Sequence, residues 1–160
     1  MVKKTFFQKK EFLFSLIAIV VVILDQLTKY LVLKFQPYFG FRYLKITFIK
    51  NTGAGFGILK DNALLLGIVS LMVAVLVIVY YKKIPTEKIP QILFAVFLGG
   101  VVGNLLDRFF RGYVIDFINL SFWPAFNIAD SALSIAVVGL VIYSIKEELK
   151  EKKKNRHHIK

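Results

Sequence analysis

The chain contains no cysteine among its 160 residues, and its only two histidines, His157 and His158, lie in a lysine-rich tail. The absence of cysteine excludes disulfide bonds, cysteine nucleophiles and thiolate metal sites. Because histidine is nearly absent, a Ser/His/Asp triad or a histidine-bound zinc ion has almost no residues from which to form. We therefore expect no metal and no cofactor, and carboxylates remain as the candidate catalytic groups.

Acidic residues are scarce as well, since 10 Asp and Glu stand against 22 Lys and Arg and the net charge is +12. A basic balance can indicate nucleic-acid binding, but here the cations gather at the chain ends and in one short loop. The pattern is neither that of a basic amphipathic helix nor that of a basic sheet with interleaved aromatic residues. We expect no nucleic-acid partner.

Apolar residues, in contrast, make up 57% of the chain and concentrate in long runs. Four runs, 12–33, 63–81, 91–109 and 125–145, are each about 19 to 22 residues long, enough to cross roughly 30 Å of hydrocarbon. The sequence therefore predicts one integral membrane domain over residues 1–160, an all-α bundle of four transmembrane helices. The first run begins like a secretory signal but lacks a cleavage site, so we expect it to be retained.

The distribution of lysine and arginine predicts the orientation of this bundle. Basic residues crowd the segment before the first run, the loop between the second and third runs, and residues 146–160. The longer segments 34–62 and 110–124 hold few for their length. Both termini are therefore expected in the cytoplasm, with 146–160 as a solvated basic tail near anionic lipid. Segments 34–62 and 110–124 are expected on the outer side.

The two outer segments have strand-like sequences. In "FRYLKITFIKNTGAGFGIL" alternating apolar residues are followed by Gly53, Gly55 and Gly57, which predicts a small sheet and then a tight glycine-rich turn. In "GYVIDFINLSFW" β-branched and aromatic residues surround Asp116. Together they predict a small extracytoplasmic β-rich platform on the outer face of the membrane.

Four acids fall at one level of this topology. Asp25 lies in the outer half of the first run and Asp107 near the outer end of the third, while Asp116 lies in the second outer segment and Asp130 at the start of the last run. Charges at membrane depth are costly, so an intramembrane carboxylate is a functional-site hypothesis.

Ion pairing is the structural alternative for two of these acids. Asp25 and Lys29 are four residues apart on a helix, as are Asp107 and Arg111, and either pair could only fix orientation at the interface. The other two acids have no basic residue three or four positions away. They need another explanation.

Two polar stripes predict how the acids meet. At helical spacing the stripes comprise Asn127, Asp130, Ser131 and Ser134 on the last run and Gly100, Asn104, Asp107 and Arg111 on the third. We expect the stripes to face each other, helped by close packing at Gly99 and Gly103, with Asp116 over the outer end. Two close carboxyls in a low dielectric share one proton, so one can activate a water while the other polarises a carbonyl. That is the chemistry of aspartic proteases.

Four segments resemble a known family, and they occur in its order. They are "DQLTKY" (25–30), "NTGAGFGIL" (51–59), "GNLLDRFFRGYVIDF" (103–117) and "FNIADSAL" (126–133). They resemble the motifs of signal peptidase II, the lipoprotein signal peptidase, over essentially the whole chain apart from the tails. This family is an intramembrane aspartyl endopeptidase that removes the signal peptide from bacterial prolipoproteins after a diacylglyceryl group has been attached to the lipobox cysteine.

The resemblance implies a role for each motif residue. It implies a catalytic pair, Asp116 and Asp130; substrate-binding or supporting residues Asn51, Gly53, Asn104, Arg108 and Asn127; and structural polar residues Asp25, Lys29 and Asp107. It also implies a site near the outer face of the bacterial plasma (inner) membrane, with the modified prolipoprotein and membrane lipid as partners. We expect a monomer.

Two other classes of protein remain open at this point. A small transporter would use Asp25, Asp107 and Asp130 as a relay, and it would distribute polar residues across the membrane depth. A scaffold protein would carry only structural acids and would tolerate Asn at Asp116 and Asp130. The motif resemblance favours the peptidase.

Overall fold

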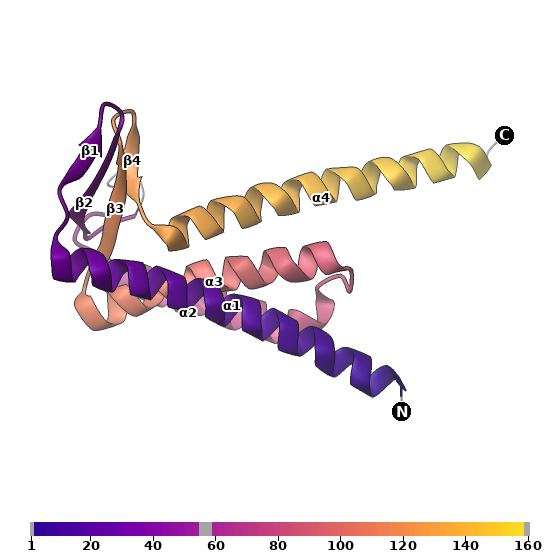
Figure 1. Ribbon diagram of the computed structural model, residues 1–160. Coiled ribbons are helices and arrows are strands. Elements are labelled where there is room, and N and C mark those ends of the chain that lie inside the picture. Colours follow the sequence, from indigo (N-terminus) through magenta and orange to yellow (C-terminus); the bar gives the residue numbers. More distant parts are fainter. Residues whose placement is uncertain (1, 55–58, 159–160) are drawn as a thin grey trace.

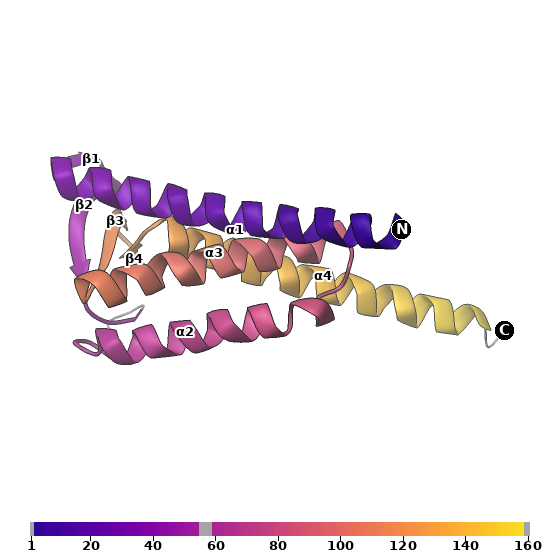
Figure 2. The same ribbon diagram turned by 90° about the horizontal axis from the view of Figure 1, so that it is seen from below.

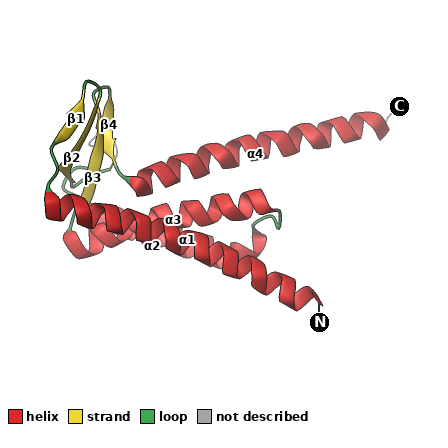
Figure 3. Ribbon diagram, viewed as in Figure 1, coloured by secondary structure: helices red, strands yellow, loops and turns green. Residues whose placement is uncertain are grey.

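The computed structural model describes residues 2–54 and 59–158, within which four α-helices and a four-stranded antiparallel sheet form (Figure 1). The helices are α1 (Val2–Phe35), α2 (Ala63–Val79), α3 (Lys88–Arg111) and α4 (Ile128–His158), with a 3₁₀ turn, η2 (Tyr81–Lys83), after α2. The strands are β1 (Phe39–Phe41), β2 (Leu44–Asn51), β3 (Val114–Leu120) and β4 (Trp123–Phe126). The sheet stands at one end of the helices, and both ends of the described chain lie at the other (Figures 1 and 3).

In the described part of the chain, three helices are long and apolar enough to cross a membrane. They are α1 from Lys10 to Phe35, α3, and α4 from Ile128 to Asn155, with mean hydropathies of 2.1, 1.9 and 2.0. Helix α2 is apolar throughout but has 17 residues, about 25 Å at the helical rise. It is shorter than the predicted run 63–81 because the chain leaves the α-helix and turns through η2. A mostly helical membrane fold with a small sheet is confirmed, with three helices of full spanning length.

The sheet has the strand order β1-β2-β3-β4, all antiparallel. Strands β2 and β3 pair Ile49 with Asp116 and Asn51 with Val114, with a register shift between Ile46 and Ile49. The first four residues of β3 are buried, because this strand is central and packs against α1. Strands are therefore confirmed in both segments that were predicted to contain them, and Asp116 is buried.

The start of α4 differs from the sequence prediction. The apolar run begins at Ala125, but Phe126 belongs to β4 and pairs with Ile118, so the helix begins at Ile128. Asn127 then caps it, with its Oδ1 accepting a hydrogen bond from the backbone N–H of Asp130 at 2.9 Å.

The predicted basic tail continues α4 as helix. Its Lys and Glu residues have good helix propensity. Glu148 also pairs with Lys152 one turn later at 2.5 Å. Helix α4 therefore runs past the apolar run to His158.

Helix α3 is the centre of the bundle, and it packs on α1, α2 and α4 (Figure 2). The predicted small-residue surface faces α1. A Cβ atom at Gly99 would lie 2.6 Å from Cβ of Val21, and one at Gly103 would lie 2.6 Å from Oδ2 of Asp25. Gly100 faces α4 in the same way. Glycine thus permits helix approaches that a side chain would block, and this brings the polar stripes of three helices together.

Candidate active site

The polar residues of the predicted site meet where the helix bundle joins the sheet. They are Asp25 and Lys29 from α1; Asn51 and Gly53 at the end of β2 and just after it; Asn104, Asp107 and Arg108 from α3; Asp116 from β3; and Asn127 and Asp130 at the start of α4. Of the predicted glycine-rich turn, Gly55 and Gly57 lie outside the described residues. The expected facing of the α3 and α4 stripes is observed, since Asn104 Nδ2 donates a hydrogen bond to Asp130 Oδ1 at 2.7 Å.

Amide groups surround Asp116 and Asp130. Asp116 accepts hydrogen bonds from Nδ2 of Asn127 and Nδ2 of Asn51, at 2.8 Å on each of its two oxygens. Asp130 accepts one from Asn104 on Oδ1 and one from the backbone N–H of Asn127 on Oδ2, at 3.2 Å. Each of the four carboxyl oxygens is therefore oriented by a neutral N–H donor.

Asn127 joins the two acids. Its side chain donates to Asp116, its backbone N–H donates to Asp130, and its Oδ1 receives the backbone N–H of Asp130. The reciprocal bonds between Asn127 and Asp130 have the form of a capping box, which fixes the first turn of α4. The same residue that starts the helix therefore sets Asp130 relative to Asp116.

Burial perturbs the Asp116 carboxyl. Its side chain lies in the dry face of β3, where the residue is 2% exposed. Burial first, and the negative charge of Asp130 second, raise the pKa of Asp116 from 3.8 to about 6. Hydrogen bonds from Asn51 and Asn127 and the positive charge of Lys29 act in the opposite direction on this pKa and only partly offset the rise. Asp116 thus exchanges its proton near neutral pH.

A second group of acids lies directly beside the first and is neutralised by cations. Lys29, fully buried, pairs with Oδ2 of Asp25 at 2.8 Å and with Oδ2 of Asp107 at 2.9 Å. Arg111 pairs with the other oxygen of Asp107. Both ion pairs predicted from helical spacing are present, together with a link between α1 and α3 through Lys29.

The paired acids also hold the backbone that carries Asp116 and Asp130. Asp107 Oδ2 accepts the N–H of Ile115 at 3.1 Å, and Asp25 Oδ1 accepts the N–H of Ala129 at 2.9 Å. Ile115 and Ala129 each directly precede one of those two acids. The ion-paired cluster therefore fixes the backbone next to the other two carboxyls.

Gln26 is a member of this cluster that sequence reasoning missed. Its Nε2 donates to the carbonyl of Gly103 at 3.0 Å and to Asp107 at 3.2 Å, and its Oε1 accepts from Arg111 at 3.1 Å. The signal was its place next to Asp25 near the end of an apolar helix, where an uncharged polar residue also needs partners.

Two cavities lie against the aspartates. One of 170 Å³ is lined by Asp130, Asn104 and Arg108 together with apolar residues of β3 and β4. The other, of 430 Å³, is lined by Asp116, residues 49–54, Lys60 and part of β4. Arg108 Nη2 donates to the carbonyl of Gly53 at 3.4 Å, while its buried Nε has no hydrogen-bond partner among the described residues. An extended chain passing from one cavity to the other would run past both carboxyls.

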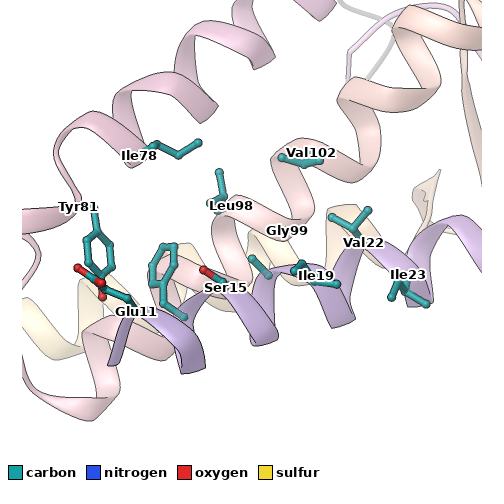
Figure 4. Close-up of a pocket in the computed structure, with 12 residues that line it drawn as sticks. Glu11, Ser15, Ile19, Val22, Ile23, Ile78, Tyr81, Leu98, Gly99 and Val102 are labelled. Carbon is teal, nitrogen blue, oxygen red and sulfur yellow. The ribbon is translucent and has the colours of Figure 1, made fainter. Parts of the chain in front are cut away.

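A larger cavity, of 580 Å³, lies elsewhere, between α1, α2 and α3 (Figure 4). Apolar side chains line it, apart from Glu11, Ser15 and Tyr81 toward one end. No pair of acids and no side-chain amide is among its lining residues in the described chain, so it lacks two carboxyls that could share a proton. The aspartates are therefore the better candidate site.

Comparison with known proteins finds relatives over most of the chain. The profile of the family described as signal peptidase (SPase) II matches residues 17–146. The lipoprotein signal peptidase of Caldanaerobacter subterraneus is 40% identical over 128 residues, which cover 76% of this chain and 86% of that one. That of Halalkalibacterium halodurans is 38% identical over 153 residues, covering 88% and 97%. A solved bacterial membrane enzyme superposes with a TM-score of 0.77 at 32% identity, covering 83% of this chain and 87% of that one.

Fold, site and relatives define a multi-pass bacterial membrane enzyme, a protease of the aspartic type. The chain belongs to the signal peptidase II family. The transporter alternative is not supported, because the described buried acids collect at the sheet end and are not distributed along the helices.

Proposed function

We propose that this enzyme cleaves the signal peptide from diacylglyceryl-modified bacterial prolipoproteins, on the N-terminal side of the modified cysteine, with Asp116 and Asp130 as its catalytic pair. One observation carries the proposal. Asn127 bridges the buried carboxyl of Asp116 and the partly buried carboxyl of Asp130, whose hydrogen-bond donors among the described residues are all amides, whereas the neighbouring Asp25 and Asp107 are neutralised by cations. The relatives named lipoprotein signal peptidases support the same substrate class.

The chemistry needs one proton shared by the pair. The ionised aspartate takes a proton from a water, whose oxygen attacks the carbonyl carbon preceding the modified cysteine, while the protonated aspartate donates its proton to the carbonyl oxygen. The tetrahedral intermediate collapses as the C–N bond breaks. The leaving amine then takes the proton that came from the water, and the new carboxyl returns its proton to the pair. The raised pKa of Asp116 supports this sharing near neutral pH.

Substrate binding follows from the two cavities. The substrate enters sideways from the bilayer with its acyl chains in lipid, and its extended segment lies between the sheet and the helices. The guanidinium of Arg108 provides a fork of donors for the peptide backbone or a lipid carbonyl beside Asp130.

The orientation proposed is four spans, α2 included, with cytoplasmic termini and the sheet at the outer face of the plasma membrane. The concentration of basic residues at the end opposite the sheet supports it. The enzyme is expected to act as a monomer, because one chain already supplies hydrogen-bond donors to both carboxyls.

The direct test uses purified wild type, Asp116→Asn and Asp130→Asn in detergent with a diacylglyceryl-modified prolipoprotein as substrate. Cleavage is followed by mass, and thermal unfolding of each variant is measured alongside. We expect both variants to stay folded and lose turnover. If either variant cleaves at the wild-type rate, the substituted residue does not belong to the catalytic pair. A wild-type enzyme that is folded but inactive would contradict the proposed substrate.

A further inference from the structure

We propose that Lys29 is a positioning residue for catalysis: its ammonium group sets the orientation of the Asn104 amide and, through that amide, the hydrogen bond that orients Asp130. The proposal rests on the proposed function and adds to it a residue that does not touch the catalytic pair.

The contacts of Lys29 indicate how its ammonium group orients Asn104 and, through Asn104, Asp130. Its Nζ lies 2.8 Å from Oδ2 of Asp25, 2.9 Å from Oδ2 of Asp107 and 2.9 Å from Oδ1 of Asn104. An ammonium group has three donors and no acceptor, so Oδ1 of Asn104 must face it. The NH₂ group of Asn104 is thereby turned the other way, where it meets Oδ1 of Asp130 at 2.7 Å.

Charge neutralisation alone does not explain the third contact. Asp25 and Asp107 account for two of the three donors, and Asp107 already has Arg111 as a second cation. The remaining donor meets a neutral amide whose other end touches a proposed catalytic acid. A lysine that served only as a structural counter-ion would not need that connection.

Asn127 cannot replace Lys29 in this role. Its Nδ2 carries two hydrogens, yet it is close to three acceptors: Oδ1 of Asp116 at 2.8 Å, Oδ1 of Asn104 at 3.1 Å and the carbonyl of Ile115 at 3.3 Å. Its bond to Asn104 is one of the two longer ones. Without Lys29 the Asn104 amide would be held mainly by a shared donor, and it could rotate.

Lys29 also acts through its charge. The ionisable groups that interact with it are Asp25 on α1, Asp107 on α3, Asp116 on β3 and Asp130 on α4. Arg108 and Arg111 on α3 interact with some of the same acids. Its positive charge lowers the pKa of Asp116, against the effect of burial. Removal of Lys29 would leave Asp25 and Asp107 with an uncompensated negative charge and would raise that pKa further.

A double-mutant cycle separates positioning from a structural role. The variants are Lys29→Met, Asn104→Ala and the combination, with kcat and KM for the modified prolipoprotein measured in detergent. We expect Lys29→Met to lower kcat by about 10- to 100-fold, by analogy with the outer-shell partners that orient metal ligands, with KM changed by less than about twofold. We expect the combination to be no worse than Asn104→Ala alone, because Lys29 acts through Asn104.

A second set of variants guards against simple loss of folding and isolates the charge. Lys29→Met paired with Asp25→Asn keeps the buried cluster neutral, and Arg111→Met removes a cation from Asp107 without touching Asn104. We expect the paired variant to stay folded with the same loss of kcat. Arg111→Met should keep kcat within about threefold of wild type, since it lacks the contact to Asn104. In Lys29→Met alone, the pH–rate profile should move to higher pH.

The outcomes distinguish this inference from the proposed function. If Asp130→Asn loses turnover but the folded paired variant cleaves like wild type, Lys29 is not a positioning residue. The same conclusion follows if the combination of Lys29→Met and Asn104→Ala lowers kcat by the product of the two single-variant factors. If Asp130→Asn itself cleaves like wild type, the proposed catalytic pair fails first. A kcat loss equal in Arg111→Met and Lys29→Met would assign the effect to general destabilisation and would also contradict the inference.

Discussion

Two clusters of acids lie side by side at the sheet end of this protein, and they differ in what faces their oxygens. Asp25 and Asp107 are paired with Lys29 and Arg111. The oxygens of Asp116 and Asp130 are faced by amides alone among the hydrogen bonds of the described residues. An amide donor orients a carboxyl but stabilises its ionised form less than a cation does. A carboxyl with only amide donors can therefore still exchange a proton. The paired cluster therefore builds the site, and we propose that the other cluster performs the reaction.

The largest expected effect comes from neutralising the amide-faced acids. Asp116→Asn or Asp130→Asn should lower turnover by at least about 10³-fold, because each removes a proton-transfer group. The melting temperature should be retained, since Asn preserves the shape of the side chain. Single-turnover cleavage of the modified prolipoprotein measures the loss. Turnover within tenfold of wild type would place the chemistry elsewhere.

The ion-paired cluster should respond in stability instead. Asp107→Ala leaves Lys29 without one of its partners and the Ile115 N–H without its acceptor. Breaking a buried ion-pair network in this way should cost about 3 to 5 kcal/mol. Unfolding in detergent checks this, with Glu148→Gln on the exposed part of α4 as the matched control. Unchanged unfolding of Asp107→Ala would show that this cluster does not support the fold.

The pH dependence of stability should report on Asp116. Its pKa is raised from 3.8 to about 6 on folding, so the folded protein binds the proton more tightly than the unfolded chain does. The neutral carboxyl contributes fully to the free energy of unfolding below about pH 4, and this contribution is lost as pH rises to about 6. The loss amounts to roughly 3 kcal/mol in the free energy of unfolding. Melting temperatures of wild type and Asp116→Asn between pH 4 and 8 should show a steeper fall for wild type. Parallel curves would mean that Asp116 titrates normally.

Helix packing between the clusters should give a smaller effect. Gly103→Ala would put a Cβ atom 2.6 Å from Oδ2 of Asp25 and 3.1 Å from Cβ of Ala129. Overpacking of this kind costs about 1 to 3 kcal/mol. Gly67→Ala is the control, because its nearest neighbour is a Phe109 ring atom at an ordinary 3.4 Å. Equal unfolding temperatures for the two variants would show that α1 and α3 can separate at Gly103 without cost.

The smallest effect should come from the exposed ion pair on the basic end of α4. Glu148→Gln removes the partner of Lys152, and both side chains are more than 60% exposed. Such pairs contribute about 0.3 to 0.5 kcal/mol. We expect turnover and unfolding to stay at wild-type values in physiological salt. A loss of either would give the basic end of α4 a role that the two clusters do not explain.

Local spacing predicted those parts of the site that lie on one element. The Asp25–Lys29 and Asp107–Arg111 pairs follow from the four-residue helical repeat, and the strand around Asp116 follows from its β-branched neighbours. The motif resemblance supplied the residues that local patterns cannot rank, such as Asn51.

Apart from the expected facing of the α3 and α4 stripes, contacts between distant segments could not be predicted in this way. Lys29 and Asp107 are nearly eighty positions apart, and Gln26 joins the cluster only because Gly103 lets α3 approach α1. The start of α4 was missed because Phe126 reads as apolar helix but pairs with Ile118 in the sheet. Tertiary pairing overrode a local preference at that position.

The path of the chain between Asp116 and Asp130 has a consequence for work in real bilayers. Both acids belong to one short unit, in which β3 turns back through β4 into the first turn of α4, and Asn127 ties the unit together. Transmembrane helices change tilt when bilayer thickness changes. Because the two carboxyls lie on the same unit, their separation depends less on the tilt of α2, which supplies none of the named site residues, than on the contacts to α1 and α3. We expect turnover to tolerate lipids of different chain length better than the stability of the bundle does.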